Sequence, residues 1–508
     1  MRLPPLSLAM IVPLVGCVDD LDPCLAEAYP ISAALDPGTT RTGLYETVTA
    51  FEHADVERTH VYRADFGGSL TTPGDNRVIV RPMSGVHETP YNIVTRERDE
   101  VFVYGGTQGD REDAQGPFVA RLDAETGAVV WRTNLRNTKE QGEFLWPGLV
   151  TAHGNGDLYA VYGTRLARLD PETGEREAEL QLPTHSASAP QDTNFNGFTV
   201  LDSGVIVTKS FGRPEGCDEQ GVDALTTCES EATPLPPSIV VSVDPEAMTV
   251  IDAVELDESS GGRLTRAAFE GRELVYVPGA ETIFRFTVDN GQLELDEGWR
   301  VADYLKPGQT LASAPAILGD WVVFQTNANL STAPLSVFAV AQGDDTMRLS
   351  VDPFTPGMPP ISAIPSALTV DPDNRRIYPM DAGRGQIGCV ELVDGERLEV
   401  RWVVDQVTIN HTSLVGPPDA RVLVATDSPD LLRVVLGPAE TYDEQVVWRS
   451  AETGEELARS APLPPMMQGD PLAPGFFGVW YYPQADGTML QLEVESPELA
   501  ECRSAADE

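Results

Sequence analysis

The amino-acid sequence predicts an all-β protein built from repeated four-stranded units, on the basis of three observations. One tight turn, Asp-Ala-Glu-Thr-Gly or a close variant of it, recurs along the 508 residues. Alternating apolar and polar residues around each copy indicate β-strands, and the unit repeats at roughly 40 to 55 residues. The sequence beyond the N-terminal region lacks the pattern of an amphipathic helix of ordinary length. Such repeats are typical of the blades of a β-propeller.

The recurring turn has a composition that suits a tight hairpin. In "DAETG" at 123–127 the aspartate can accept backbone N–H groups across the turn, and the glycine supplies a positive φ. Residues 170–174 repeat each of these features. Ser450 replaces the aspartate in the copy at 450–454, and the copy at 244–248 has lost the glycine. We expect each turn to join the third and fourth strands of a unit.

Eight segments match the unit, and the last is one strand short. They cover 91–135, 148–182, 196–256, 265–295, 313–351, 365–404, 412–460 and 471–494. Residues 56–66 are expected to supply the missing strand, so that pairing of the N- and C-terminal strands closes the ring. The sequence favours eight blades, with seven as the next choice and a two-domain β-sandwich as the alternative fold. Trp131 and Trp448 are expected to pack between adjacent sheets.

The stretch "ARLDAETGAVVW", residues 120–131, resembles the repeat of the pyrroloquinoline-quinone-type (quinoprotein-like) β-propellers. That superfamily contains quinoprotein dehydrogenases and non-enzymatic relatives, among them a lipoprotein of the machinery that assembles outer-membrane β-barrels. The resemblance implies the propeller fold. The enzymes of that family share a vicinal Cys-Cys disulfide over the quinone and a calcium site beside it. This sequence has neither adjacent cysteines nor a Cys-x-x-Cys-His motif for haem, so pyrroloquinoline quinone is not expected.

Residues 1–17, "MRLPPLSLAMIVPLVGC", have the composition of a bacterial lipoprotein signal. Arg2 precedes an apolar stretch too short to span a bilayer, and Leu14 to Cys17 resembles the lipobox, in which the chain is cut before a cysteine that carries lipid. Two or three acyl chains on Cys17 would anchor the protein firmly. Val18, in place of an aspartate, favours the outer membrane by the same resemblance. An ordinary secretory signal is the alternative.

These features divide the chain into four parts and place it in the cell envelope. The expected parts are a signal peptide (1–16), a tether and N-terminal segment (17–50), the β-propeller (51–497) and an acidic C-terminal tail (498–508). The lipid anchor would hold the protein on the periplasmic face of the outer membrane or on the cell surface. We expect a monomer.

The chain is strongly acidic, with 79 Asp and Glu against 35 Lys and Arg and a formal net charge of -44. Nucleic-acid binding depends on clustered Lys and Arg, so a nucleic-acid partner is not expected. Arginine supplies nearly all the positive charge, because the only lysines are Lys139, Lys209 and Lys306. We interpret this composition as a solvated acidic surface, with a cation-binding surface as the alternative.

With only six cysteines, the chain can form few disulfide bonds. Cys217 and Cys228 flank a polar insertion and are expected to form a disulfide in an oxidising compartment, with zinc binding as the alternative. Cys24 and Cys502 lie near opposite ends of the sequence and could join the termini of a closed ring. Cys389 would then be the remaining thiol, although the sequence cannot prove this connectivity.

The stretch "DTNFNG" at 192–197 is the local motif most suggestive of a metal. Asp192, Asn194 and Asn196 match the first half of a calcium loop, in which oxygen ligands at alternate positions converge on one cation. The expected bidentate glutamate is missing, since Ser203 stands at its position. A polar turn leading into an inner strand is the interpretation we favour over calcium.

Small polar residues begin several of the predicted inner strands. They are Asn196, Ser313, Ser366 and Ser413, with His411 beside them. If the inner strands line the central channel of the propeller, these side chains would ring its mouth and could bind a small ligand or a metal. Calcium-dependent lactonase propellers use such a position. Tight packing of converging strands explains the same small residues without a ligand.

The sequence therefore favours a non-enzymatic protein: an outer-membrane-anchored scaffold that binds another envelope protein through its blade-connecting loops, with no cofactor. No serine has a nucleophile-elbow context, and the six histidines form no H-E-x-x-H zinc motif. A propeller hydrolase or lactonase, or a small-ligand-binding protein with calcium at the central channel, is the alternative.

Overall fold

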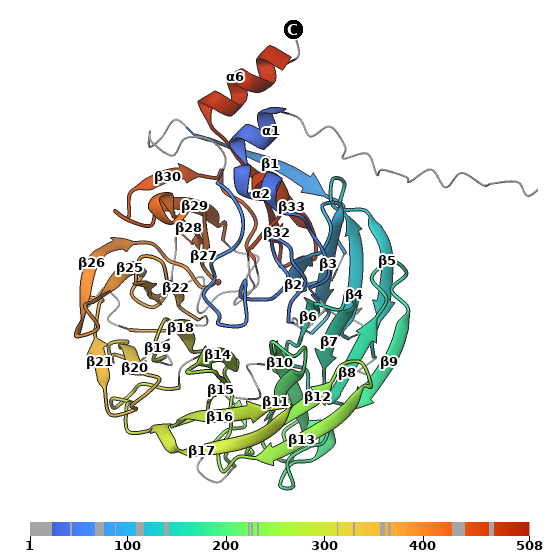
Figure 1. Cartoon of the computed structure of the whole chain (residues 1–508), viewed down its shortest axis with the longest axis vertical. Coiled ribbons are helices and arrows are strands. Elements are labelled where there is room, and N and C mark those ends of the chain that lie inside the picture. The colour runs from blue at the N-terminus through green and yellow to red at the C-terminus, as the bar shows by residue number, and fades with distance from the viewer. Residues whose placement is uncertain are drawn as a thin grey trace, which may run out of the picture.

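Eight β-sheets follow one another around a common axis in the computed structural model and form an eight-bladed β-propeller (Figure 1). The eight blades favoured by the sequence are confirmed. The structure describes residues 23–506 except 41–42, 67–75, 87, 108–115, 137–141, 222–223, 225–226, 231–232, 312, 329–330, 356–360, 364–366, 429–441 and 467–471. The predicted lipidation site Cys17 and the predicted channel residue Ser366 lie outside the described residues.

Each blade is antiparallel, and in the first seven blades the main strands run from the axis to the rim in the order of the chain. The first two blades are β2 (Pro90–Thr95), β3 (Glu100–Gly105), β4 (Phe118–Asp123) and β5 (Val129–Asn134), then β6 (Leu149–Ala152), β7 (Leu158–Tyr162), β8 (Arg165–Leu169) and β9 (Arg176–Gln181). The third and fourth are β10 (Thr193–Val200), β11 (Ile206–Gly212), β12 (Ile239–Asp244) and β13 (Thr249–Glu255), then β14 (Thr265–Phe269), β15 (Arg272–Pro278), β16 (Ile283–Asp289) and β17 (Gln292–Val301).

The remaining blades follow the same plan with small irregularities. The fifth is β18 (Ala316–Leu318), β19 (Trp321–Gln325), β20 (Val337–Ala341) and β21 (Arg348–Val351). The sixth is β22 (Thr369–Asp371), β23 (Arg376–Tyr378), β25 (Gln386–Val393) and β26 (Arg397–Asp405), with the short β24 (Met380–Asp381) beside β25. The seventh is β27 (Ser413–Val415), β28 (Val422–Asp427), β29 (Gln445–Ser450) and β30 (Glu456–Arg459), and the eighth contains β31 (Ala473–Pro474), β32 (Val479–Pro483) and β33 (Met489–Glu495).

The eighth blade closes the ring with a strand from the other end of the chain. β1 (Arg77–Met83) pairs with β33, from Arg77 opposite Glu495 to Met83 opposite Met489, which confirms closure by N- and C-terminal strands. The prediction that residues 56–66 supply this strand is wrong. An outermost strand is partly exposed, and Val78 to Val80 suit it, whereas Arg58, Thr59 and His60 are buried and find partners only near the axis.

Short helices lie outside the blades. α1 (Pro23–Ala28), α2 (Pro30–Ala34) and α6 (Pro497–Ala506) gather beside β1, where Cys24 and Cys502 form a disulfide (Figure 1). The 3-10 helices η1 (Pro190–Asp192), η2 (Pro418–Ala420) and η4 (Phe476–Gly478) precede strands. Among the described residues, none of the helices has the length and hydropathy needed to span a bilayer.

The repeated turn has the hydrogen bonds that its composition predicts. Oδ1 of Asp123 accepts from the backbone N–H of Thr126 at 2.8 Å, and Oδ1 of Asp170 accepts from that of Thr173 at 2.7 Å. The glycines after these threonines have φ values of 69° and 71°. In the copy without glycine, Met248 takes the same conformation at φ 49°, a strained one for a residue with a side chain.

Tryptophans join neighbouring blades, as predicted for Trp131 and Trp448. Trp131 on β5 donates its indole N–H to Pro171 O in the turn of the second blade, and its ring covers Gly174 so closely that a Cβ there would lie 2.4 Å from it. Trp448 of the seventh blade is fully buried against Trp480 of the eighth, with ring centroids 6.4 Å apart. The core is therefore a series of apolar layers between adjacent sheets.

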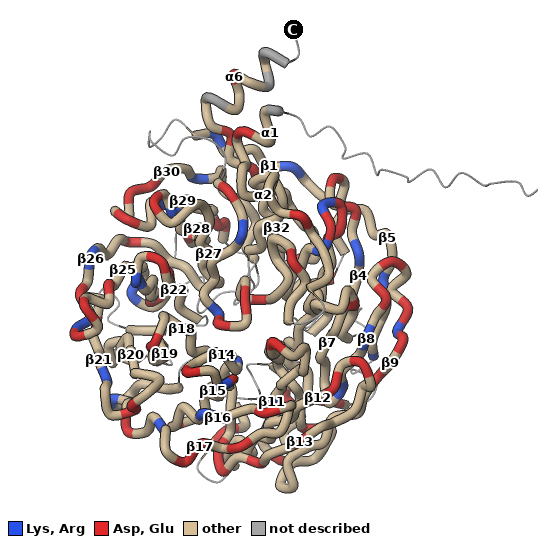
Figure 2. Tube along the Cα trace, in the orientation of Figure 1, with Lys and Arg blue, Asp and Glu red and all other residues tan. Residues whose placement is uncertain are grey.

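Acidic residues surround the rim of the wheel, with arginines among them (Figure 2). Many of these arginines pair with carboxylates: Arg96 and Arg121 both contact Glu172 of the next blade, and Arg376 contacts Glu452. Exposed pairs of this kind each add little to stability, about 0 to 1 kcal/mol. The surface is thus acidic overall but is patterned by local ion pairs.

Candidate functional site at the propeller axis

The axis of the propeller is occupied by the protein's own chain. Residues 43–66, which we call the axial segment, contact all eight blades. Backbone hydrogen bonds join Thr49 to Thr95 in the first blade, Ala50 to Ala152 in the second, Val56 to Arg266 in the fourth, Glu57 to Ile317 in the fifth, Thr59 to Val370 in the sixth and His60 to Leu414 in the seventh. Phe51 meets Phe198 of the third blade, and the hydroxyl of Thr49 donates to Pro474 O in the eighth.

Three residues of the axial segment have positive φ values although none is glycine. These are Ala54 at 69°, Arg58 at 56° and His60 at 61°. Such conformations cost about 1 kcal/mol or more each and persist where surrounding contacts enforce them. The backbone bonds to successive blades provide that enforcement, and the resulting bends turn polar side chains toward one another.

Glu52 is the buried anion of the axis. Its carboxylate accepts from the Arg263 guanidinium at 2.9 Å and from the Tyr91 hydroxyl at 2.7 Å, and Arg58 lies 3.4 Å away. Burial alone would raise the pKa of Glu52, but the charge of Arg263, together with His53 and Arg58, holds the pKa well below its usual range. The carboxylate is therefore ionised at neutral pH and balanced by two arginines.

Three of the six histidines meet beside Glu52. His53 Nδ1 lies 2.5 Å from His60 Nε2, and the ring centroid of His411 lies 4.3 Å from that of His53. All three side chains are buried. Burial lowers the pKa of His60 to about 4 and that of His411 to about 3, and it lowers the pKa of His53 well below the usual value. We call these residues the histidine cluster.

Lys209 is a second unusual buried cation near the axis. It lies on β11 with 1% of its surface exposed, and its ammonium group donates to Ser260 O. Burial lowers the pKa of Lys209 well below its usual range, and the nearby charges of Arg263 and Arg58 act in the same direction. Through Arg263 and Arg58, Lys209 belongs to the same polar centre as Glu52.

The structure places the residues predicted to ring the channel in different settings. His411 belongs to the histidine cluster, and Ser413 is buried on β27 with its hydroxyl donating to Leu472 O at 3.2 Å. Asn196 donates to Gly261 O at 2.9 Å, while Ser313 is half-buried beyond the fourth blade, where its carbonyl accepts from Arg263 N–H. A ligand role for these residues stays a prediction.

The residues of the "DTNFNG" stretch span η1 and the start of β10, the inner strand of the third blade. Asp192 forms an ion pair with Arg213 at 2.8 Å, so its carboxylate already has a cationic partner. Asn194 donates to Phe144 O at 3.4 Å. The favoured alternative of a polar turn leading into an inner strand agrees with this placement, and calcium binding here remains a prediction without a test.

The five cysteines that the structure describes form two disulfides and leave one buried thiol. Cys217 and Cys228 form a disulfide with a Cα–Cα distance of 5.9 Å, and Cys24 and Cys502 form the other across 478 residues of sequence. Cys389 is free and buried on β25. Burial raises the pKa of Cys389 to about 12, so its thiol is unreactive at neutral pH.

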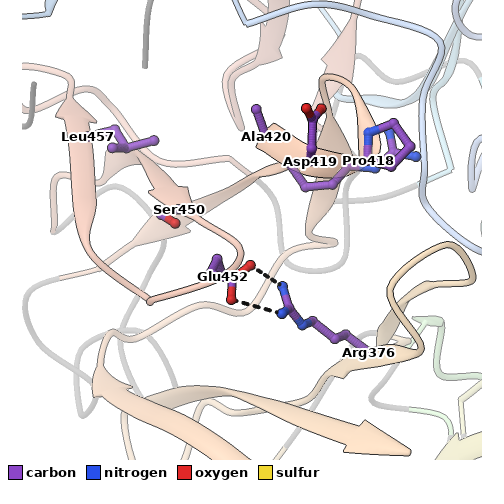
Figure 3. A pocket seen from close by; sticks show the side chains of 8 residues that line it. Arg376, Pro418, Asp419, Ala420, Ser450, Glu452 and Leu457 are labelled. Atoms are coloured by element: carbon purple, nitrogen blue, oxygen red, sulfur yellow. Dashed lines mark hydrogen bonds and ion pairs between the residues drawn. The ribbon is translucent and has the colours of Figure 1, made fainter. Parts of the chain in front are cut away.

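A small hollow lies on the surface between the sixth and seventh blades, away from the axis (Figure 3). Arg376 on β23 and Glu452 in the turn after β29 point toward each other across it and form an ion pair of 3.1 Å. Pro418, Asp419 and Ala420 of η2 form its other side. Arg376 and Glu452 neutralise one another, so the hollow has little uncompensated charge with which to bind a ligand selectively.

Most of the axial centre is not apparent from the sequence, because the pattern at 56–66 predicts a strand. Glu52, His53 and His60 lie within nine residues of one another, in "EHADVERTH", and this density of ionisable residues was the available signal. His411 was predicted for the channel, yet its partners could not be identified from spacing. Arg263 and Tyr91 come from different blades, and only closure of the ring brings them to Glu52.

These features define the class of protein: an eight-bladed β-propeller of four-stranded antiparallel blades whose axis holds its own N-terminal segment. No protein-family model matches the sequence, and no curated protein is significantly similar to it. Among solved structures, the chain is similar in fold to a quinohemoprotein alcohol dehydrogenase from Comamonas testosteroni, with 12% identity, a TM-score of 0.57 and coverage of 92% of this chain and 84% of that chain.

Two further propellers are more distant. BamB from Moraxella catarrhalis is 13% identical with a TM-score of 0.41, covering 82% of this chain and all of that one. The WD40 domain of SCAP from fission yeast is 10% identical with a TM-score of 0.42, covering 84% and 99%. The likeness to the alcohol dehydrogenase supports the β-propeller fold, and an identity this low carries no activity with it.

The fold likeness raises the question of a quinone cofactor, and the residues present do not fit one. Phe51, Glu52 and Arg58 of the axial segment are buried at the axis, so a flat cofactor placed there would have to displace them. The sequence has no adjacent cysteines to cover such a ring. We derive no quinone chemistry for this chain.

Proposed function

We propose that this protein is a lipid-anchored, non-enzymatic propeller that acts as a protein-interaction scaffold in the cell envelope. The observation that carries the proposal is the axial segment, which contacts all eight blades and fills the axis of the wheel. With the axis filled by the chain itself, the blade loops and the rim are the surfaces left to meet another molecule.

The rigidity of the wheel supports a scaffold role. The ring is closed by β1 and β33 and by the disulfide between Cys24 and Cys502. A closed ring presents its loops in a constant arrangement, which reduces the ordering cost of binding a partner. The acidic rim would favour a partner with a basic or polar contact surface and would repel anionic lipid.

The lipobox-like stretch ending at Cys17 supports the envelope location. The test is the intact mass of the protein isolated from membranes of a bacterial host. Cleavage before Cys17 with the added mass of diacylglycerol and a third acyl chain is the expected result. A Cys17→Ser variant should lose this mass and leave the membrane fraction. A mature N-terminus elsewhere would refute the anchor.

The scaffold role is tested separately by photo-crosslinking. A photoreactive residue at Glu125 or Glu175, both exposed in repeated turns, should crosslink one envelope protein. The same residue at Glu399, exposed on the outer strand β26, compares the rim with the loops, and a product formed there but not at the turns would place the partner on the rim. Loss of the product in the Cys17→Ser background would link binding to anchoring. Absence of any product from the turns would contradict a loop-mediated scaffold.

A further inference from the structure

The histidine cluster unites two parts of the chain that are far apart in sequence. His53 and His60 belong to the axial segment, and His411 lies just before β27 of the seventh blade. One ring nitrogen of each residue lies within 4.8 Å of the others. Three of the six histidines of the chain therefore converge at one buried point.

Hydrogen bonds indicate which nitrogens are free to bind a ligand. His60 Nδ1 lies 2.7 Å from Thr412 O, and because a carbonyl oxygen can only accept, this nitrogen carries the proton. The lone pair of a neutral His60 is then on Nε2, which faces His53 Nδ1. A histidine that binds a metal through one nitrogen typically donates the other to a carbonyl or carboxylate in this way.

His53 fits the same pattern on its other side. Without a metal, His53 Nδ1 donates to His60 Nε2; moving that proton to His53 Nε2, which lies 3.4 Å from Glu52 Oε2, would leave Nδ1 free to bind an ion. Glu52 is held in turn by Arg263 and Tyr91. His411 Nδ1 is buried and has no hydrogen-bond partner among the described residues. Such an orphaned buried nitrogen calls for an explanation.

We propose that His53, His60 and His411 bind one transition-metal ion of the zinc or copper type. Three neutral imidazoles are the ligand set that these ions prefer, and a fourth position remains for an exchangeable ligand. Because Arg263 and Arg58 already balance Glu52, the charge of the ion is not offset by the protein, and hydroxide or chloride suits that fourth position. The ion would tie the axial segment to the seventh blade.

Only a small adjustment is needed to form the site. Zinc–nitrogen bonds of about 2.0–2.1 Å at tetrahedral angles place ligand nitrogens roughly 3.3 Å apart. His53 Nδ1 and His60 Nε2, now 2.5 Å apart, would separate by about 0.8 Å. The ligand atoms that are up to 4.8 Å apart would approach. Rotation of the imidazole rings supplies movements of this size.

The test uses the full chain and the metal ions themselves. The protein is unfolded in guanidinium, stripped with a chelator, and refolded with Zn²⁺, Co²⁺ or Cu²⁺, and the metal that survives dialysis is counted. We expect one equivalent, a melting temperature several degrees above that of the metal-free protein, and tetrahedral Co²⁺ absorption bands. X-ray absorption at the zinc edge should show three imidazole ligands.

Matched histidine variants distinguish the cluster from adventitious binding. His411→Asn should lose the bound equivalent and the melting shift, whereas His185→Asn, at a histidine outside the cluster, should keep both. If His411→Asn does not fold, the cobalt and zinc spectra of the unaltered chain still decide. Absence of stoichiometric metal in that chain, or equal loss in both variants, would overturn the proposal. The result is independent of membrane anchoring and of any protein partner.

Discussion

Buried ionisable residues are the unusual feature of this protein at the scale of the residue. Glu52, Arg58 and Lys209 are almost wholly buried near an axis that many propellers leave open. Burying a charge is costly unless it is paired, and here the pairs come from the axial segment and from separate blades. Removing one partner would leave the other buried and uncompensated. The polar axis therefore depends on the assembled ring.

Glu444 gives a pH-dependent prediction. It is fully buried on the side of the seventh blade, accepts from Ser428 at 2.8 Å and from Tyr482 at 3.1 Å, and burial raises its pKa. Since the folded-state pKa lies above the ordinary 4.5, its contribution to stability is full below pH 4.5 and is lost as pH rises toward the folded value. As pH rises from 4 to 7, the unfolding free energy of Glu444→Gln should therefore decrease less than that of the unaltered protein.

Urea unfolding from pH 4 to 7 measures the decrease in unfolding free energy of each protein. The two decreases should differ by about 1.4 kcal/mol for each unit by which the pKa of Glu444 is raised. Glu455→Gln, at an exposed position of the same blade, controls for the loss of one carboxylate. Parallel stability curves for the unaltered protein and Glu444→Gln would contradict the assignment.

Cys389 provides a prediction about reactivity. Its thiol is buried and its pKa is raised to about 12 by burial, so at pH 8 almost no thiolate is present. Iodoacetamide should leave Cys389 unmodified in the folded protein and modify it after denaturation. Peptide mass mapping reports the label at this position. Rapid labelling of the folded protein would show that the sixth blade opens.

At the scale of the element, two of the repeated turns are covered by a tryptophan of the preceding blade, whereas Met83 covers Gly127 of the first turn. Trp131 covers Gly174 of the second blade, and Trp402 covers Gly454 of the seventh blade in the same way, with its indole N–H donating to Ala451 O. The glycine thus has two roles: it adopts a positive φ, and it leaves room for the ring from the preceding blade. The turn is conserved in composition along the chain because both roles recur.

These two roles can be separated by substitution. Gly174→Ala introduces a Cβ at φ 71° that would lie 2.4 Å from the Trp131 ring. Gly271→Ala has a nearly equal φ of 74° but open space around its Cβ. We expect Gly271→Ala to cost about 1 kcal/mol of unfolding free energy and Gly174→Ala roughly 2 to 4 kcal/mol. Denaturant unfolding of both variants gives the comparison, and equal losses would exclude a packing role for the glycine.

At the scale of the whole molecule, closure is the feature on which stability depends. A ring buries the faces of every blade only if the first and last blades meet, and β1 with β33 achieves this by backbone pairing. The disulfide between Cys24 and Cys502 adds a covalent link beside that closure. Forces that separate the termini would have to break both.

The two disulfides are expected to differ in their contribution. The Cys24–Cys502 bond closes 478 residues and the Cys217–Cys228 bond closes 11. The chain-entropy model predicts about 3 kcal/mol for the short loop and about 6 kcal/mol for the long one. Paired serine substitutions at each disulfide, compared by thermal and urea unfolding, should rank in that order. A larger loss from the short loop would indicate that the insertion, and not closure, limits stability.

The fold could be predicted from sequence to a large extent. The repeated turn is local chemistry, since one carboxylate, one hydroxyl and one glycine determine it within five residues, and counting the repeated units around it predicted eight blades. The prediction failed for residues 56–66, whose alternation looked like a strand. Their place on the axis depends on partners such as Leu264 O and Thr412 O, which are hundreds of residues away.

The sequence by itself determined the all-β class, the number of blades, the hairpin turns and the acidic charge, because these follow from contacts within one unit and from composition. Tertiary structure alone decided which strand closes the ring, what occupies the axis, and that His53, His60 and His411 meet. The physical reason is that a closed ring brings eight inner strands to one point. Residues there become neighbours through the geometry of closure, and no spacing along the chain encodes that proximity.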